Sequence, residues 1–449
     1  MQFPDWFFPL LVVAIYGWEI ITTRQIKRPV LTAKSVVLVG LTLFMAFVFL
    51  NLPLFEIFFW VLILDKSLPL IVAIVVFLLS FPTEIWRDRI ILQAEELLRQ
   101  RKKLTVIGVT GSFGKSSTKE FVAQVLSEKF KVLKTPGSQN TPIGIAKTII
   151  KGLRKDTQVL VVEIGAYKIG EIEEVCQIIK PSIGILTGIS AQHLSLFGSI
   201  DNIIQAKYEL IKSLPKNGLA VFNSNNLYCR ELYQKTKINK LRYGFSQESD
   251  VKVKDWKVNP QDLRFTFQIG RTRQSVKINL LGRHNVENLL PAILVAHHLG
   301  MTLIQIKKAL EKISYLPLTM QPIKFMNAMF IDDTFNASPE GVNAAFDYLK
   351  VFKKRRKILI LTSLIELGKE ADKVHENLGR EAGNIFDIVY LTNNNFAQSF
   401  ADGLKRGKKT TNFRIAGSKE IKEMLLGNIE KGDVVLFEGK EAGTVLKLL

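Results

Sequence analysis

Long apolar stretches dominate the first 82 residues of the chain. They are Phe7–Ile21, Ser35–Leu52 and Leu54–Phe81, and the second of them contains no charged residue. Because a membrane span needs about 20 apolar residues, these lengths predict transmembrane helices, with three spans favoured. Part of the third stretch, Leu54–Leu64, is a candidate for an interfacial or re-entrant segment. A signal peptide over the first stretch and a buried apolar hairpin of a soluble protein are the alternatives.

Basic residues flank these stretches in two clusters. By the positive-inside rule both clusters are expected to be cytoplasmic, so two crossings separate them and the N-terminus lies outside. This topology predicts an integral membrane protein whose catalytic domains are in the cytoplasm. The clusters are Arg24, Lys27, Arg28 and Lys34, and then Arg87, Arg89, Arg99, Arg101, Lys102 and Lys103.

The pattern changes after the apolar segment. Glu84–Lys103 has the spacing of an amphipathic connecting helix. From Leu104 to about Pro317, short β-branched runs alternate with helical patterns, and Asp250–Leu281 alternates polar and apolar residues as an antiparallel sheet does. A second α/β pattern starts near Pro322. The predicted fold is therefore α/β: transmembrane helices (1–82), a linker helix (83–103), a parallel-sheet ATP-binding domain with a flanking antiparallel sheet (104–319) and a smaller doubly wound domain (320–449).

A glycine-rich stretch lies between the apolar run Leu104–Val109 and a predicted helix, Thr118–Phe130. Such a turn presents backbone N–H groups and a helix N-terminus to an anion. Lys115 adds a positive charge, and the hydroxyl of Ser116 is suited to Mg²⁺. Val109 replaces the first glycine of the strict P-loop pattern, but the shorter form T-G-x-x-G-K-S keeps the chemistry. We therefore predict an ATP site formed by Thr110, Gly111, Ser112, Phe113, Gly114, Lys115, Ser116 and Ser117.

Composition narrows the set of partners. The formal net charge of +20 suits nucleic acid, anionic lipid or anionic substrates. Because the basic residues are spread along the chain and no aromatic–basic RNA motif is visible, membrane lipid is predicted as a partner and nucleic acid is not. Cys176 and Cys229 form no metal-binding pattern and indicate no disulfide framework. The length of 449 residues allows about two soluble domains after the apolar segment.

Further motifs follow the glycine-rich stretch in a recognisable order. They are Thr135–Gly144, Val162–Ala166 with Gly170–Ile172, His193-Leu194 with Phe197–Ser199, Ala206-Lys207, Gly282–Asn288, Asp332–Pro339, and Glu366–Gly368 with His375. Together these motifs resemble the Mur ligase family, over the chain from Leu104 to the C-terminus. Within the family, they are most similar to the enzymes that add D-alanyl-D-alanine to a muramyl peptide.

The resemblance implies roles for polar residues at predicted strand ends. Glu163 ends a buried-type strand, where a carboxylate is costly unless it is paired or bound to metal. With His193 and Ser116 it forms a predicted Mg²⁺ site. The catalytic candidates are Lys115, Glu163, His193 and Lys207. A salt bridge for Glu163 and a hydrogen-bonded loop position for His193 are the alternatives. In related ligases a lysine placed as Lys207 is carbamylated and helps to hold a second Mg²⁺; an ordinary surface lysine is equally compatible with the sequence.

Two other motifs are predicted to contact ATP. Asn285 and Asn288 lie three residues apart on one helix face, and the family uses such a pair at the adenine. Asp333 and Asn336 follow a predicted strand of the C-terminal domain, in a loop that the family places near the ribose and phosphates. Helix capping by Asn285 and a plain Asx-turn are the alternatives. His297 and His298 have no partner motif and are predicted to be structural.

The chain also departs from the family pattern. Apolar stretches stand where the family has its soluble UDP-sugar domain, Met320-Gln321 replaces an expected Gly-Arg pair, and the tail Glu438–Gly443 differs from the usual Gly-Ser-Arg ending. These differences leave the nucleotide chemistry in place and the acceptor open.

The predicted function is an ATP- and Mg²⁺-dependent amide ligase that acts through an acyl phosphate. Its partners are a muramyl-peptide or other carboxylate acceptor and an amine donor such as D-alanyl-D-alanine. The alternatives are a membrane-bound Mur-type ligase for a lipid-linked or polyglutamate-type acceptor, an ATP-driven transporter, and an inactive scaffold.

Overall fold

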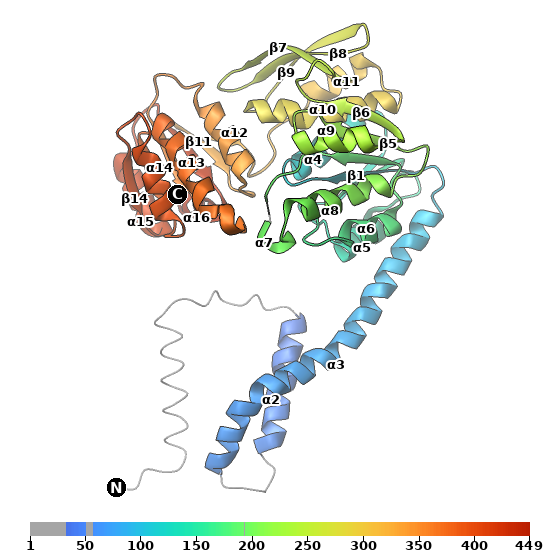
Figure 1. Ribbon diagram of the computed structural model, residues 1–449, viewed down its shortest axis with the longest axis vertical. Helices are drawn as coiled ribbons and strands as arrows, with labels where there is room; N and C mark the ends of the chain where they lie inside the picture. Colours follow the sequence, from blue (N-terminus) through green and yellow to red (C-terminus); the bar gives the residue numbers. More distant parts are fainter. Residues whose placement is uncertain (1–32, 51–56, 193) are drawn as a thin grey trace. The chain divides into compact units, whose positions relative to one another are not determined.

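The computed structural model describes residues 33–50, 57–192 and 194–449, and it contains two compact units, Met1–Ile90 and Ile91–Leu449 (Figure 1). The first unit holds α2 (Ala33–Leu50) and most of α3 (Ile57–Arg99). The predicted linker helix is the last part of α3, because neither Pro69 nor Pro82 ends that helix.

One helix among the described residues, Lys66–Arg99, is long and apolar enough to cross a membrane. Only 11% of its apolar window is buried. A single such helix is weak support for a membrane span, because core helices and signal sequences share its length and composition. The apolar part of α2, Ser35–Met45, is shorter. The predicted first span, Phe7–Ile21, and the residues Leu54–Glu56 of the third lie outside the described residues.

The second unit begins with a parallel six-stranded sheet in the order β2-β3-β1-β4-β5-β6. Helices α4 and α10 cover one face of this sheet, and α8 packs on the other face, where it contacts β1 and β4. The strands are β1 (Thr105–Thr110), β2 (Val132–Lys134), β3 (Val159–Glu163), β4 (Ile183–Leu186), β5 (Leu219–Asn223) and β6 (Asn239–Tyr243). The helices are α4 (Lys115–Leu126), α5 (Pro142–Gly152), α6 (Glu171–Ile179), α7 (Leu194–Phe197), α8 (Ile200–Lys212) and α9 (Leu227–Lys235).

An antiparallel sheet of β7, β8 and β9 follows, as the alternating pattern of Asp250–Leu281 predicts. Its inward side chains, such as Phe265 and Phe267, join the same hydrophobic core as α4 and α10. Its outward positions are polar, so one face of the sheet is buried and the other is exposed to solvent. The elements are β7 (Lys252–Val258), β8 (Leu263–Ile269), β9 (Thr272–Ile278), α10 (Arg283–His298) and α11 (Leu303–Glu311).

A second six-stranded sheet occupies the C-terminal part, in the order β10-β11-β15-β12-β13-β14. Only the β10–β11 pair is antiparallel. Separate hydrophobic clusters cover its two faces, so this sheet has its own core. The strands are β10 (Gln321–Phe325), β11 (Ala328–Asp333), β12 (Lys357–Leu361), β13 (Ile388–Leu391), β14 (Asn412–Ile415) and β15 (Val434–Glu438); the helices are α12 (Pro339–Leu349), η1 (Gly368–Glu370), α13 (Ala371–Ile385), α14 (Ala397–Lys405), α15 (Ser418–Asn428) and α16 (Lys440–Leu448).

The glycine-rich stretch lies at the point of the first sheet where the strand order reverses. The chain leaves β1 for β2 on one side and later returns to β4 on the other side. In open α/β sheets such a switch point opens a crevice at the carboxyl ends of the strands, where ligands bind. The fold class predicted from the sequence is confirmed in its α/β part. The domain boundaries at 82, 103 and 319 stay predictions.

Candidate functional site

The glycine-rich loop connects β1 to α4 at the switch point. Gly114 precedes the helix in the left-handed conformation, with φ of 74°. At Gly111, a Cβ atom would lie 2.1 Å from Oγ1 of Thr187 at the end of β4. The loop is thus pressed against the neighbouring strand, and only glycine fits there. Helix α4 starts at Lys115, three residues earlier than predicted, so Ser116 and Ser117 lie in its first turn.

Lys115 lies across the loop that precedes it. Its ammonium group donates hydrogen bonds to the carbonyl oxygens of Gly111 at 2.8 Å and of Ser112 at 3.0 Å. Burial lowers the pKa of Lys115, and the charge of Glu163 opposes that shift. The side chain is therefore close to both the loop and the end of β3, where an anion bound by the loop would meet it.

Glu163, the last residue of β3, is buried and faces a buried lysine. The distance from its Oε2 to Nζ of Lys119 is 3.5 Å, and Nδ2 of Asn140 donates to Oε1 at 3.4 Å. The salt bridge that was the alternative to a metal role for Glu163 is therefore present. Lys119 also donates to the carbonyl oxygen of Gly137 at 2.5 Å and lies 3.3 Å from Oε1 of Glu120, so Glu163 shares this ammonium group with other partners.

The surroundings of Glu163 fit a hard cation. Its Oε2 atom is buried and, although it lies 3.5 Å from Nζ of Lys119, accepts no hydrogen bond among the described residues, so it can take a further ligand. Carboxylate and hydroxyl oxygens are preferred Mg²⁺ ligands. Within the described residues, no three His, Cys, Asp or Glu side chains gather into a metal cluster. The third predicted ligand, His193, lies outside the described residues.

Lys207 is not a surface lysine. It lies on α8 with 3% of its surface exposed, donates to the carbonyl oxygen of Ala166 at 3.3 Å, and lies over the ring of Phe197. Burial lowers its pKa to about 7, and the charge of Lys115 acts in the same direction. Burial therefore favours the neutral amine of Lys207, which is the nucleophilic form.

Helix α10 brings only one of its two predicted asparagines to the loop. Asn288 faces Gly114, where an added Cβ would be 2.7 Å from Oδ1 of Asn288. Asn285 is buried instead, and its Nδ2 donates to the carbonyl oxygen of Leu281 at 2.8 Å. Asn285 does not line the cavity described below, and its role in ATP binding stays a prediction.

A cavity of about 390 Å³ joins the two sheets at this point. The loop residues 112–117 and Asn288 line one side of it, and Asp333 and Asn336 line the other. Residues predicted from separate motifs thus meet around one space. Other lining residues were not predicted: Gln192, His284, Glu287, Thr319, Phe335, Ser338, Glu340, Gly341 and Ala344. Most of these residues lie inside or next to the motifs named in the sequence analysis, so their position in the sequence could have indicated that they belong to the site.

Asp333 has a buried carboxyl partner that the sequence did not reveal. Parallel pairing of β11 and β15 sets Asp333 opposite Glu438, and Glu438 is fully buried. No donor among the described residues reaches either oxygen of Glu438, so Asp333 is its hydrogen-bonding neighbour once one carboxyl holds a proton. Burial raises the pKa of Glu438 well above its usual value and that of Asp333 to about 7. The pair therefore shares at least one proton near neutral pH.

This pair makes a testable contribution to pH-dependent stability. A carboxyl whose pKa is raised on folding binds more protons in the folded state, so its contribution is present below the unfolded pKa and is lost as pH rises. For Asp333 that window runs from about 4 to about 7. We expect the melting temperature of the wild type, relative to Glu438→Gln, to fall across this window. Glu423→Gln, at an exposed position of α15, serves as the control. Parallel pH curves for wild type and Glu438→Gln would contradict the assignment.

Comparison with known proteins identifies the family. The Mur ligase middle domain matches residues 109–296, and the Mur ligase glutamate ligase domain matches residues 320–441. The UDP-N-acetylmuramoyl-tripeptide–D-alanyl-D-alanine ligase of Escherichia coli K12 is 30% identical over 313 residues, which cover 68% of this chain and 69% of that enzyme. The chain belongs to the Mur ligase family. It is an ATP-dependent ligase that uses ATP and Mg²⁺, as the motifs predicted.

Solved structures agree with this assignment. A crystal structure of MurF from Acinetobacter baumannii matches with a TM-score of 0.74 and 27% identity, and the match covers 81% of this chain and 80% of that one. MurF ligase from Thermotoga maritima in complex with ADP matches with a TM-score of 0.70 and 28% identity, over 81% and 83% of the two chains. The enzyme of Synechocystis with the same name as the E. coli relative is 29% identical over 77% of this chain and 73% of its own length.

The family also corrects the predicted localisation. The prediction of an integral membrane protein is wrong, because the Mur ligases that match this chain are soluble cytoplasmic enzymes and the described residues hold a single apolar helix as weak support. The sequence argument failed because it counted apolar length and flanking charge, and neither distinguishes a membrane span from another apolar helix. The predicted membrane lipid partner is unsupported for the same reason. Family membership also decides against the transporter.

Proposed function

We propose that this Mur ligase adds D-alanyl-D-alanine to a muramoyl tripeptide in the synthesis of peptidoglycan precursors. Relatives from several bacteria carry this activity in their names, at about 30% identity over two thirds or more of the chain. The observation that carries the proposal within the structure is the cavity in which the glycine-rich loop of one sheet faces Asp333 and Asn336 of the other. A cavity between two domains suits a reaction that must bring two substrates together and exclude water.

The reaction proceeds in two displacements. A carboxylate oxygen of the tripeptide attacks the γ-phosphorus of ATP, the bond from that phosphorus to the bridging oxygen breaks, and ADP leaves with the electron pair. The amine of D-alanyl-D-alanine then attacks the acyl carbon, phosphate leaves, and the nitrogen loses a proton as the amide forms. Charge builds up on the transferring phosphoryl oxygens, which is where fixed N–H donors and cations lower the barrier most.

In this proposal the loop residues Thr110–Ser117 bind the phosphates. The N–H groups of the first turn of α4 form the anion-binding end of this loop. The ammonium group of Lys115 exchanges its two loop carbonyls for phosphate oxygens. Ser116, Glu163 and His193 hold Mg²⁺, which when bound neutralises phosphate charge. Asn288 orients the nucleotide from the α10 side, and Asp333 with Asn336 does so from the C-terminal domain. Asn285 is left out, because it does not line the cavity and its Nδ2 donates to the carbonyl oxygen of Leu281.

Product analysis tests the proposal directly. The purified protein is incubated with ATP, Mg²⁺, D-alanyl-D-alanine and UDP-linked muramoyl tripeptide, and phosphate release is followed beside mass spectrometry of the product. We expect release that requires both substrates and a product heavier by the dipeptide minus water. Release that needs neither substrate, or a product built with another amine, would exclude this specificity.

Lys207 supplies a further prediction. We propose that its neutral amine adds CO₂ to form a carbamate, which gives the site another anionic oxygen ligand for Mg²⁺ and releases one proton. Lys207→Arg cannot be neutral at pH 7, so we expect a loss of turnover of about 10²-fold or more. Lys212→Arg, on the exposed side of the same helix, is the control. Removal of dissolved CO₂ should slow the wild type reversibly and leave the residual rate of Lys207→Arg unchanged; equal sensitivity of both would count against the carbamate.

A further inference from the structure

A second, larger cavity lies away from the ATP cavity. Its volume is about 680 Å³, within the range of small-molecule sites. One wall comes from the end of the flanking antiparallel sheet and includes Gln261. The other comes from the β10–β11 hairpin, which is an edge of the C-terminal sheet and includes Phe325 and Met329. Nothing in the proposed reaction uses this space.

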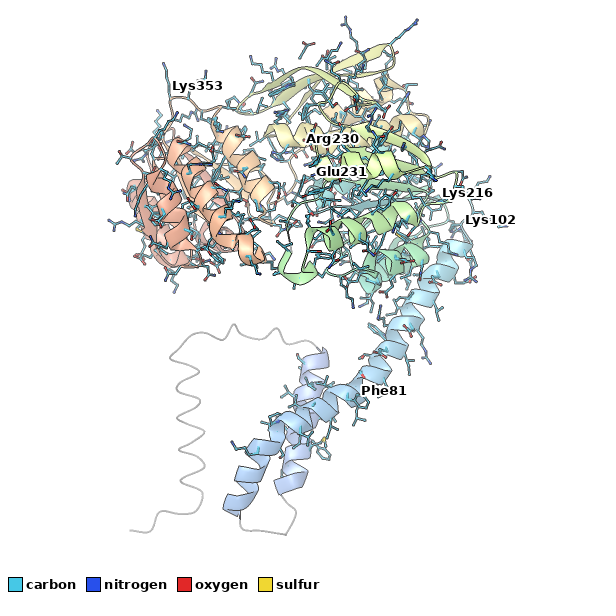
Figure 2. All side chains as sticks on the ribbon, in the orientation of Figure 1. Phe81, Lys102, Lys216, Arg230, Glu231 and Lys353 are labelled. Atoms are coloured by element: carbon cyan, nitrogen blue, oxygen red, sulfur yellow. The ribbon has the colours of Figure 1, made fainter. Side chains whose placement is uncertain are left out.

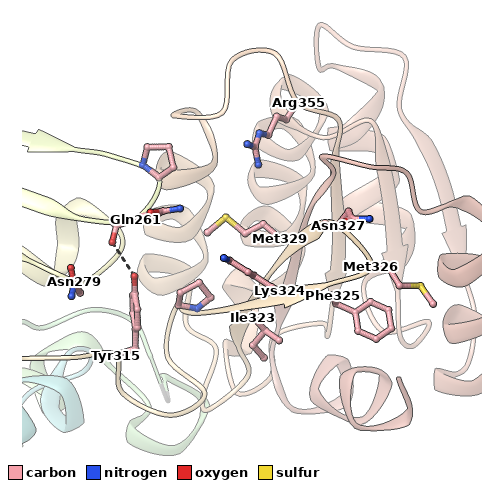
Figure 3. A pocket seen from close by; sticks show the side chains of 13 residues that line it. Gln261, Asn279, Tyr315, Ile323, Lys324, Phe325, Met326, Asn327, Met329 and Arg355 are labelled. Atoms are coloured by element: carbon pink, nitrogen blue, oxygen red, sulfur yellow. Dashed lines mark hydrogen bonds between the residues drawn. The ribbon is translucent and has the colours of Figure 1, made fainter.

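The charged residues that line the cavity are all basic. Lys324 and Arg355 line the cavity, and no aspartate or glutamate does. Figure 3 shows their charged ends directed toward the same space, with the thioether of Met329 between them. Asp262, which follows Gln261 in the chain, is engaged by Arg264 at 3.1 Å and by Lys277 at 3.6 Å. Among the described residues that line the cavity, Lys324 and Arg355 therefore have no carboxylate partner, and the guanidinium group of Arg355 lies 5.6 Å from the centre of the Phe352 ring.

Fixed contacts hold the walls together. The hydroxyl of Tyr315 donates to the carbonyl oxygen of Gln261 at 3.0 Å, as Figure 3 shows, and the hydroxyl of Tyr348 donates to the carbonyl oxygen of Pro260 at 2.8 Å. The bond of Tyr348 joins the loop between β7 and β8 to α12 of the C-terminal part, and the bond of Tyr315 fixes the same loop to the segment after α11. The cavity is thus a built feature of the junction between the two sheets, and a ligand in it contacts both sides.

We propose that this cavity is a binding site for a small anion with an aromatic or branched apolar body. The carboxylate, sulfonate or phosphate of such a ligand lies between Lys324 and Arg355, and its apolar part covers Met329 and Phe325. Apolar contact supplies most of the affinity, and the paired cations select anions over neutral molecules of the same shape.

Naphthalene-2-sulfonate is a suitable probe, with 2-naphthol as its neutral counterpart at pH 7. Binding to the full chain is measured by isothermal titration, and the position is mapped by hydrogen–deuterium exchange of the peptides that cover Gln321–Asp333. We expect saturable binding of the sulfonate at one site, about fivefold or more tighter than that of the naphthol. Slower exchange should appear in the β10–β11 hairpin.

Substitutions test which of the two cations binds the sulfonate. Lys324→Gln and Arg355→Gln should each weaken the sulfonate about fivefold and leave the naphthol unchanged. Lys353→Gln makes the same charge change in the same loop as Arg355 but outside the cavity, and it should bind as the wild type does. All three positions are exposed, so folding is not at risk. Absence of saturable binding, protection confined to other peptides, or equal affinity in the Lys324→Gln/Arg355→Gln double variant would each overturn the proposal.

Discussion

Lys115→Ala should lower ATP-dependent ligation by about 10³-fold or more while the protein keeps its melting temperature. Among the described residues, the ammonium group donates hydrogen bonds to the loop carbonyls of Gly111 and Ser112, and Lys115 is not part of the hydrophobic core, so the fold should survive its loss. It does remove the mobile positive charge beside the transferring phosphoryl group, where one fixed donor is worth about 10²–10³ in rate. Phosphate release and thermal unfolding, measured on the same preparation, check both halves of this expectation.

The control for this variant is Lys216→Ala. Lys216 is exposed and lies on the surface, where Figure 2 labels it, and the substitution makes the same change in charge. We expect activity within twofold of the wild type. Phosphate release from Lys115→Ala at a rate near that of Lys216→Ala would remove the glycine-rich loop from the mechanism.

The sequence predicted those parts of the site that depend on local order along the chain. A strand, a glycine-rich turn and a helix are consecutive, so their relative geometry follows from the backbone, and the loop with Lys115 and Ser116 could be placed without knowledge of the sheet. The position of Glu163 at a strand end could be predicted for the same reason. The family motifs then extended the prediction to Asp333 and Asn336, which line the cavity with the loop.

Contacts between distant segments could not be predicted in this way. The pairing of Asp333 with Glu438 depends on the register of two parallel strands that are far apart in sequence. Lys119 is fully buried although it lies one turn into an amphipathic helix, because Glu120, Glu163 and Gly137 lie next to its ammonium group. The spacing of Asn285 and Asn288 gave the correct helix but not the depth at which its first turn is buried. The pattern of a single sequence contains neither the pairing register of distant strands nor the depth at which a side chain is buried.

Glu163 has two candidate partners, Lys119 and Mg²⁺, and their competition yields the last prediction. Glu163→Gln keeps the shape of the side chain and removes its charge. We expect turnover to fall by about 10²-fold or more, and the stabilisation of the protein by Mg²⁺ with a non-hydrolysable ATP analogue to shrink. At a 100-fold excess over Kd that stabilisation amounts to about 3 kcal/mol in the wild type, which thermal unfolding resolves as a shift of several degrees.

Lys119→Met distinguishes the metal role from the salt bridge. Without Lys119 the buried carboxylate of Glu163 loses its ammonium partner at 3.5 Å, and the variant should be less stable by a few kcal/mol in the absence of metal. If Glu163 binds Mg²⁺, the ion now offsets a larger free-energy cost, because the buried carboxylate of this variant has no ammonium partner. The metal-dependent rise in melting temperature should then be greatest in Lys119→Met, intermediate in the wild type and least in Glu163→Gln. Equal rises in all three would mean that Glu163 serves only the salt bridge, and should Lys119→Met fail to fold, the wild type and Glu163→Gln still give opposite answers for the two roles.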